Sequence, residues 1–76
     1  MKKNVNTKGD LKVMKWWFEF RNVLTKEQLG TLFKYIGIYW YYDKYTDPST
    51  IDDIAVRCAW VGISEYMKTD EYLSLE

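Results

Sequence analysis

Hydrophobic positions recur at helical spacing in three segments of the chain. In and just after residues 11–23, one stripe comprises Leu11, Met14 and Phe18, and an overlapping stripe comprises Val13, Trp17, Phe20 and Leu24. So broad an apolar face predicts a helix that packs between two neighbours and is capped by Asp10. Because Lys15–Phe20 is rich in strand-forming residues, a β-strand there is the competing prediction.

The second predicted helix has the clearest start and runs to about Tyr42. Thr25 and Gln28 fit a capping box, in which each side chain accepts the backbone N–H of the other residue. The core stripe of this helix comprises Leu29, Leu32, Phe33, Ile36, Tyr39 and Trp40, and a second stripe comprises Thr31, Tyr35, Ile38 and Tyr42. Gly30 and Gly37 are predicted to let another helix approach closely.

A third helix is predicted from the turn Asp47-Pro48-Ser49 to about Lys68. Its inner face would comprise Ile51, Ile54, Ala55, Cys58 and Val61 with Gly62 adjacent, and a second face would comprise Val56, Trp60, Ile63 and Met67. Asp52 and Asp53 would lie in its first turn, where acidic groups favour the helix dipole.

These segments predict a small all-α domain of three helices, with a short fourth C-terminal helix left open. Residues 1–9 are expected to form a flexible basic N-terminal arm, residues 10–68 the helical domain, and residues 69–76 an acidic tail or short helix. A chain of this length buries only about 60% of its unfolded surface, so its core is marginal without added support.

Composition narrows the classes of function. The chain has no His and one Cys, which argues against a zinc site and predicts that Cys58 is a small buried hydrophobe in a reducing compartment. No apolar stretch approaches the roughly 20 residues of a membrane span. We therefore expect a soluble cytoplasmic protein that does not bind a membrane, in the cytoplasm of the host cell if the protein is viral.

Catalysis is not predicted. The usual neutral-pH base, His, is absent, and no nucleophile, base and orienting group form a triad. The glycines are scattered and form no phosphate-binding loop. The sequence therefore predicts a non-enzymatic protein that has no catalytic residue, metal ligand or cofactor.

The aromatic run between Tyr35 and Tyr45 is the strongest indication of function. One helical stripe cannot accommodate all of its rings, so other helices or a partner must cover the remainder. Tyr and Trp dominate the residues that contribute most to protein–protein affinity. The candidate partner-binding residues are Tyr35, Ile38, Tyr41, Tyr42, Tyr45 and Trp16.

Two alternatives remain open. Lys12, Lys15 and Arg21 interleave with aromatic residues of the first helix, as in single-strand nucleic-acid binders. The zero net charge argues against this alternative. Charge is nevertheless uneven: residues 1–26 carry seven basic and two acidic groups, and residues 43–76 carry three basic and eight acidic ones. A purely self-associating protein, a homodimer covering the second stripe of helix two, is the other alternative.

Three successive motifs carry a resemblance. Phe18-Glu-Phe20, Leu24-Thr25-Lys-Glu-Gln-Leu-Gly30 and Leu32-Phe33-Lys34-Tyr35-Ile36 resemble a family of short helical proteins encoded by phages and prophages of Gram-positive bacteria. The resemblance covers about two thirds of the chain and rests on helix caps and core residues. It implies a viral setting, in which the partner is a host or phage protein and the chain acts, for example, as an inhibitor of a host defence or replication factor.

Overall fold

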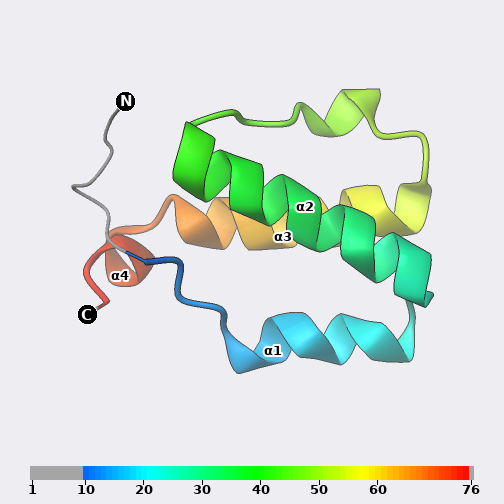
Figure 1. Ribbon diagram of the computed structural model, residues 1–76, viewed down its shortest axis with the longest axis horizontal. Coiled ribbons are helices and arrows are strands. Elements are labelled where there is room, and N and C mark those ends of the chain that lie inside the picture. The colour runs from blue at the N-terminus through cyan, green and yellow to red at the C-terminus, as the bar shows by residue number, and fades with distance from the viewer. Residues whose placement is uncertain (1–9, 76) are drawn as a thin grey trace.

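The computed structural model describes residues 10–75, and these residues form helices and no strand. In chain order the elements are α1 (Lys15–Phe18), the 3-10 helix η2 (Glu19–Asn22), α2 (Lys26–Tyr42), the 3-10 helix η3 (Pro48–Thr50), α3 (Ile54–Met67) and α4 (Asp70–Leu73). In Figure 1, α2 crosses in front of α3, α1 lies along the lower edge, and α4 follows the C-terminal end of α3. The predicted all-α domain and its short fourth helix are confirmed; the predicted arm at residues 1–9 lies outside the described residues.

The bounds of α2 follow its sequence signals. The Thr25 N–H donates to Gln28 Oε1 at 2.8 Å, and the Gln28 N–H donates to Thr25 Oγ1 at 3.1 Å. The predicted capping box is therefore confirmed. The helix ends after Tyr42 because Asp43 adopts a left-handed conformation with φ of 54°, which a short polar side chain tolerates better than a bulky one.

The first helix begins later than its sequence pattern predicts. Met14 rather than Asp10 is the N-cap of α1, and no side chain caps it. Tertiary hydrogen bonds explain the difference, because the Leu11 N–H donates to Tyr41 Oη at 3.1 Å and the Tyr72 hydroxyl donates to the Lys12 carbonyl at 2.8 Å. Two backbone groups before Met14 thus have partners outside a helix. The strand alternative for Lys15–Phe20 is wrong, because these residues are helical.

The third helix also begins later than predicted. Asp47 caps only η3, and the chain then stays extended through Ile51 to Asp53. The Asp53 carboxylate accepts the Val56 N–H at 3.1 Å and so becomes the N-cap of α3. The prediction that Asp52 and Asp53 lie in the first turn of the helix is therefore wrong, because both precede Ile54.

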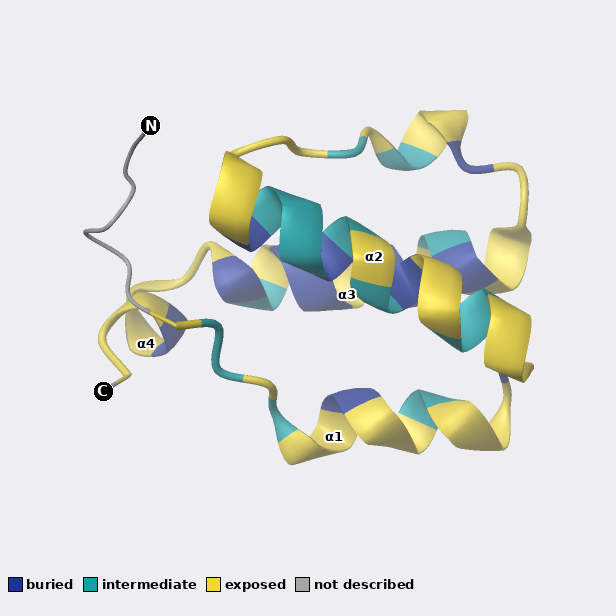
Figure 2. Cartoon of the chain, viewed as in Figure 1, coloured by how far each residue is buried: buried dark blue, intermediate teal, exposed yellow. Residues whose placement is uncertain are grey.

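The core lies where α2, α3 and the aromatic residues of α1 and α4 meet (Figure 2). Its buried hydrophobic residues are Trp17, Leu24, Leu32, Ile36, Trp40, Ile51, Val56, Ala59, Trp60, Ile63, Met67 and Tyr72. The predicted core stripe of α2 is confirmed, because its other members, Leu29, Phe33 and Tyr39, pack against this cluster.

On α3 the two predicted faces exchange roles. The face of Val56, Trp60, Ile63 and Met67 is buried, whereas Ile54 is 68% exposed and Ala55, Cys58 and Val61 are exposed too. The prediction of an inner face through Cys58, and of a buried Cys58, is therefore wrong. Both faces of α3 are apolar, and α2 packs on the one that carries the large ring of Trp60 because burying that ring removes more apolar surface from water.

Trp60 holds the segment that follows α2, residues 43–46, against the core. Its ring centroid lies 6.0 Å from that of Tyr35 and 5.9 Å from those of Tyr39 and Tyr45. Its Nε1–H donates to the Thr46 carbonyl at 2.8 Å. One side chain of α3 thereby anchors both α2 and the segment that follows α2.

The glycines of α2 do not serve helix packing. A Cβ built on Gly30 or Gly37 meets no heavy atom of the described chain within 4 Å. The prediction that they allow a close helix contact is therefore wrong for residues 10–75.

Among the same residues, no helix has the length and apolar character required to cross a membrane.

Candidate protein-binding site

The structure divides the predicted partner-binding residues by exposure. Tyr35 and Ile38 are half-buried, and Tyr35 packs against Trp60. Tyr41 is 56% exposed and Tyr42 is 74% exposed at the C-terminal end of α2. The two exposed rings are therefore the members of the aromatic run that the described residues cover least.

Tyr41 and Tyr45 are exposed but held in place by different elements. The Tyr41 hydroxyl accepts the Leu11 N–H from the segment before α1. The Tyr45 ring packs on Trp60, and the Lys68 ammonium of α3 lies 4.5 Å from its centroid. Within residues 10–75, no hydrogen bond or ring contact holds the Tyr42 side chain.

Trp16 belongs to a separate surface. It is half-exposed on α1, and its ring lies edge-on to Tyr66 of α3 at 5.6 Å and to Phe20 at 6.4 Å. Its neighbours are thus residues of α1, η2 and the C-terminal half of α3. The structure does not bring it together with the tyrosines that end α2.

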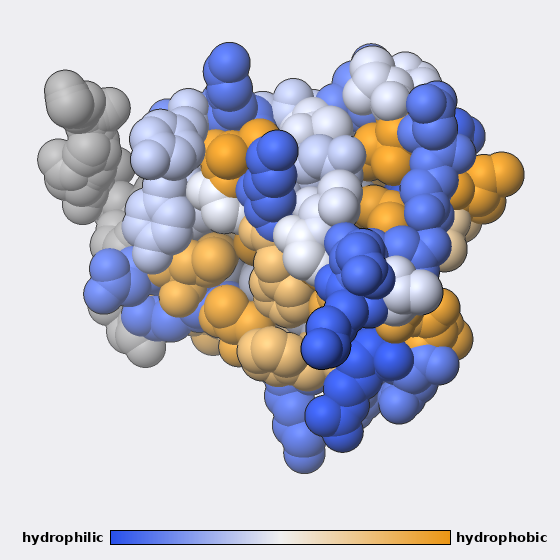
Figure 3. Space-filling model, turned by 45° about the vertical axis from the view of Figure 1, so that its right-hand side comes forward, coloured by the Kyte–Doolittle hydropathy of each residue, from blue (hydrophilic) through white to orange (hydrophobic). Residues whose placement is uncertain are grey.

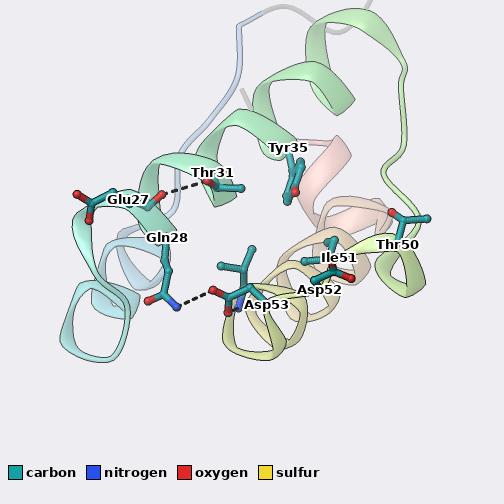
Figure 4. A pocket seen from close by; sticks show the side chains of 9 residues that line it. Glu27, Gln28, Thr31, Tyr35, Thr50, Ile51, Asp52 and Asp53 are labelled. Atoms are coloured by element: carbon teal, nitrogen blue, oxygen red, sulfur yellow. Dashed lines mark hydrogen bonds between the residues drawn. The ribbon is translucent and has the colours of Figure 1, made fainter.

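A groove of about 390 Å³ opens between α2 and the start of α3 (Figure 4). Thr31 and Tyr35 of the second α2 stripe line one wall, and residues 50–53 with Val56 line the other. The stripe continues out of the groove along α2 through Ile38 to Tyr42, at the three- and four-residue spacing that keeps side chains on one helix face. Groove and exposed tyrosine are therefore parts of one face.

The groove is acidic. Glu27, Asp52 and Asp53 contribute carboxylates to it, and Gln28 Nε2 donates to Asp53 Oδ2 at 2.8 Å across its base (Figure 4). That hydrogen bond, together with the backbone N–H of Val56, lowers the pKa of the Asp53 carboxyl. The carboxylates of Glu27 and Asp52 pair with no cation of the described chain. The groove is thus suited to a cationic group.

This groove escaped sequence reasoning. Its walls come from α2 and from a segment at least 15 residues later in the chain, so no local pattern joins them. The only available signal was the position of Thr31 and Tyr35 on one stripe.

Figure 3 shows that, on the face drawn, hydrophobic side chains reach the surface as separate groups among hydrophilic and near-neutral ones.

The Asp53 carboxylate predicts a pH effect on stability. Because its pKa is lowered in the folded state, its stabilisation is present above the ordinary Asp pKa of about 3.9 and disappears as the pH falls through the lower folded value. Asp53→Asn keeps a good N-cap but removes this titration. We expect the difference in melting temperature between wild type and Asp53→Asn to shrink as the pH is lowered from about 6 to below the ordinary Asp pKa of about 3.9. A difference independent of pH would contradict the prediction.

The basic residues of the nucleic-acid alternative are only partly available. Lys15 and Arg21 are exposed, and Lys12 is half-buried. Trp17, however, is fully buried against Tyr72, so its ring is not free to stack on a base. Of the two tryptophans interleaved with these cations, only Trp16 is exposed.

No site for metal chemistry emerges from the described residues, since nowhere in residues 10–75 do three His, Cys, Asp or Glu side chains gather as ligands.

The chain matches no protein-family model, no curated protein and no solved structure. The function is therefore inferred from the surface itself.

Proposed function

We propose that this chain is a small accessory protein of phage type that acts, without catalysis, by binding another protein. The resemblance of its motifs to phage and prophage proteins supports the setting. In that setting the partner is a host factor, such as one of defence or replication, and the chain inhibits it by occupying its surface.

The single observation that supports the proposal is the large exposed aromatic area at the end of α2. Tyr42 is 74% exposed, and it continues a stripe whose other end lines the acidic groove. Aromatic anchors bind most strongly where neighbouring contacts exclude water. Ile38, one helical turn before Tyr42, can supply such a contact. A partner that offers an apolar pocket beside a Lys or Arg side chain fits both parts of this face.

The test compares wild type with Tyr42→Ala in a pull-down from host lysate, followed by titration of the captured protein. Truncation of an anchor is expected to cost at least about 2 kcal/mol, or roughly thirtyfold in affinity. Tyr42→Ala should leave the fold intact because no described residue holds the ring. Leu73→Ala is the matched control, since Leu73 is also exposed but lies on α4.

Two results would contradict the proposal. If both Tyr42→Ala and the Tyr41→Ala/Tyr42→Ala double variant bound the partner with unchanged affinity, these tyrosines would be excluded as binding anchors. Binding of nucleic acid whose affinity falls steeply with salt, and with loss of Lys15 or Arg21, would favour the alternative. Glu27→Gln with Asp52→Asn separately tests whether the groove accepts a cationic side chain.

A further inference from the structure

The outer face of α3 carries an apolar patch that residues 10–75 leave exposed. Ile54, Ala55, Cys58, Val61 and Gly62 are all exposed, on the side of the helix opposite the buried face. In Figure 1 α3 lies behind α2. Because α2 packs on the buried face of α3, which carries Trp60 and Ile63, the exposed face lies on the side of α3 away from α2. Glu65 lies at the C-terminal end of the same face, and the rest of the face is an exposed apolar patch of the kind that marks a contact surface.

The pattern of this face is symmetric about Cys58. At about 100° per residue, Ile54 and Val61 lie along one edge, Ala55 and Gly62 along the other, and Cys58 between the edges. If a second copy of the helix runs antiparallel with the two-fold axis at Cys58, the Ile54 and Val61 edge faces the same edge of the copy. The edge of Ala55 and Gly62 then also faces its own counterpart. A face that matches its own reversed copy is suited to an isologous two-fold contact.

We propose that this face binds a second copy of the chain, with the two α3 helices antiparallel and the two-fold axis at Cys58. Ile54 of each copy then packs beside Val61 of the other, and Ala55 beside Gly62. A Cβ on Gly62 would meet nothing within 4 Å in the single chain, so this edge is open to a close approach. The surface is separate from the tyrosines that end α2, so this inference stands independently of the proposed function.

The charges at the ends of the contact are complementary. Arg57 donates through Nε and Nη2 to the Ile51 carbonyl at 3.0 and 2.7 Å, which holds its guanidinium near the level of residue 51. With the axis at Cys58, that level is opposite Glu65 of the second copy. Glu65 already lies 3.5 Å from the Lys68 ammonium of its own chain, so the Arg57 guanidinium of the second copy adds a second cation to this exposed pair. The contact forms twice in each dimer and offsets the nearby carboxylate of Asp52.

The same geometry brings the two Cys58 residues together. Packed helix axes lie about 8–10 Å apart, and Cα atoms lie about 2.3 Å from each axis. Two residues facing each other on the symmetry axis therefore have Cα atoms roughly 3.5–5.5 Å apart, a range that overlaps the 4.4–6.8 Å of disulfides. Cys58 is a free, exposed thiol, so it can report the contact.

Sedimentation equilibrium under reducing conditions tests the dimer. We expect wild type to dimerise and Ile54→Glu to weaken the dimer by at least about tenfold, because a two-fold contact loses the same side chain twice. Glu at the first position of α3 favours the helix dipole, so the monomer should stay folded by circular dichroism. Val23→Glu is the control: Val23 is also exposed but follows η2, and its replacement should leave the dimer unchanged.

Oxidation with diamide gives a second measurement on the same variants. Wild type should form a reducible dimer through Cys58 at least about ten times faster than Ile54→Glu, in proportion to the population of the paired state. A Cys58→Ser/Lys34→Cys variant, with its thiol on the outer side of α2, measures random collision. A monomeric wild type at submillimolar concentration, equal effects of the two Glu variants, or equal oxidation rates would each overturn the proposal.

Discussion

Replacing Trp60 with alanine is expected to remove most of the protein's stability at room temperature. The side chain is fully buried, contacts three tyrosine rings and anchors the Thr46 carbonyl. Removing a buried Trp side chain costs about 3–5 kcal/mol, and the whole stability of a small domain lies at the lower end of about 5–15 kcal/mol. Urea denaturation followed by circular dichroism measures the loss.

Two conservative variants separate packing from hydrogen bonding at this position. Trp60→Phe keeps an aromatic ring but leaves the Thr46 carbonyl without its donor. Trp17→Phe removes a buried Nε1–H that has no hydrogen-bond partner among the described residues, so it relieves an unsatisfied group. We therefore expect Trp60→Phe to be the more destabilising of the two, and equal or reversed effects would contradict this account of Trp60.

Tyr72→Ala is expected to be nearly as severe, although Tyr72 lies close to the C-terminal end of the described chain. It is 1% exposed, and its ring lies 5.8 Å from Trp17, 5.5 Å from Trp40 and 5.3 Å from Tyr66. Its hydroxyl also donates to the Lys12 carbonyl. Truncating a buried aromatic residue of this kind costs about 3–5 kcal/mol, and the Lys12 carbonyl loses its donor as well.

Neighbouring variants control for this effect. Leu73→Ala alters an exposed residue of the same short helix and should change the free energy of unfolding by no more than about 0.5 kcal/mol. Tyr72→Phe removes only the hydroxyl and should cost about 1 kcal/mol. If Tyr72→Ala and Leu73→Ala proved equally mild, α4 would be dispensable and the tail would not belong to the core.

Sequence signals predict the elements well where they are local. The capping box at Thr25 and Gln28 locates α2 because both hydrogen bonds form within one turn. The starts of α1 and α3 depend on tertiary contacts instead. Asp47 and Asp53 are equally good caps by sequence, and the chain uses one for η3 and the other for α3.

The candidate site was predictable only in part. The aromatic surplus of α2 was visible, but which rings are covered depends on where Trp60 lies and on how residues 43–47 return beside it. The same ambiguity reversed the faces of α3, since helical spacing alone cannot rank two apolar stripes. Burial of Trp60 ranks them, and leaves Cys58 outside.

The hydrogen bond from Tyr72 to Lys12 joins residues that are 60 positions apart. During synthesis, the core around Trp17 therefore cannot close until residue 72 has emerged from the ribosome. Until then α2 can begin at its own capping box, but the residues that cover its apolar stripe are not all available. Closure of this core thus waits for residue 72, and until then the apolar side chains of the nascent α2 are exposed to aggregation.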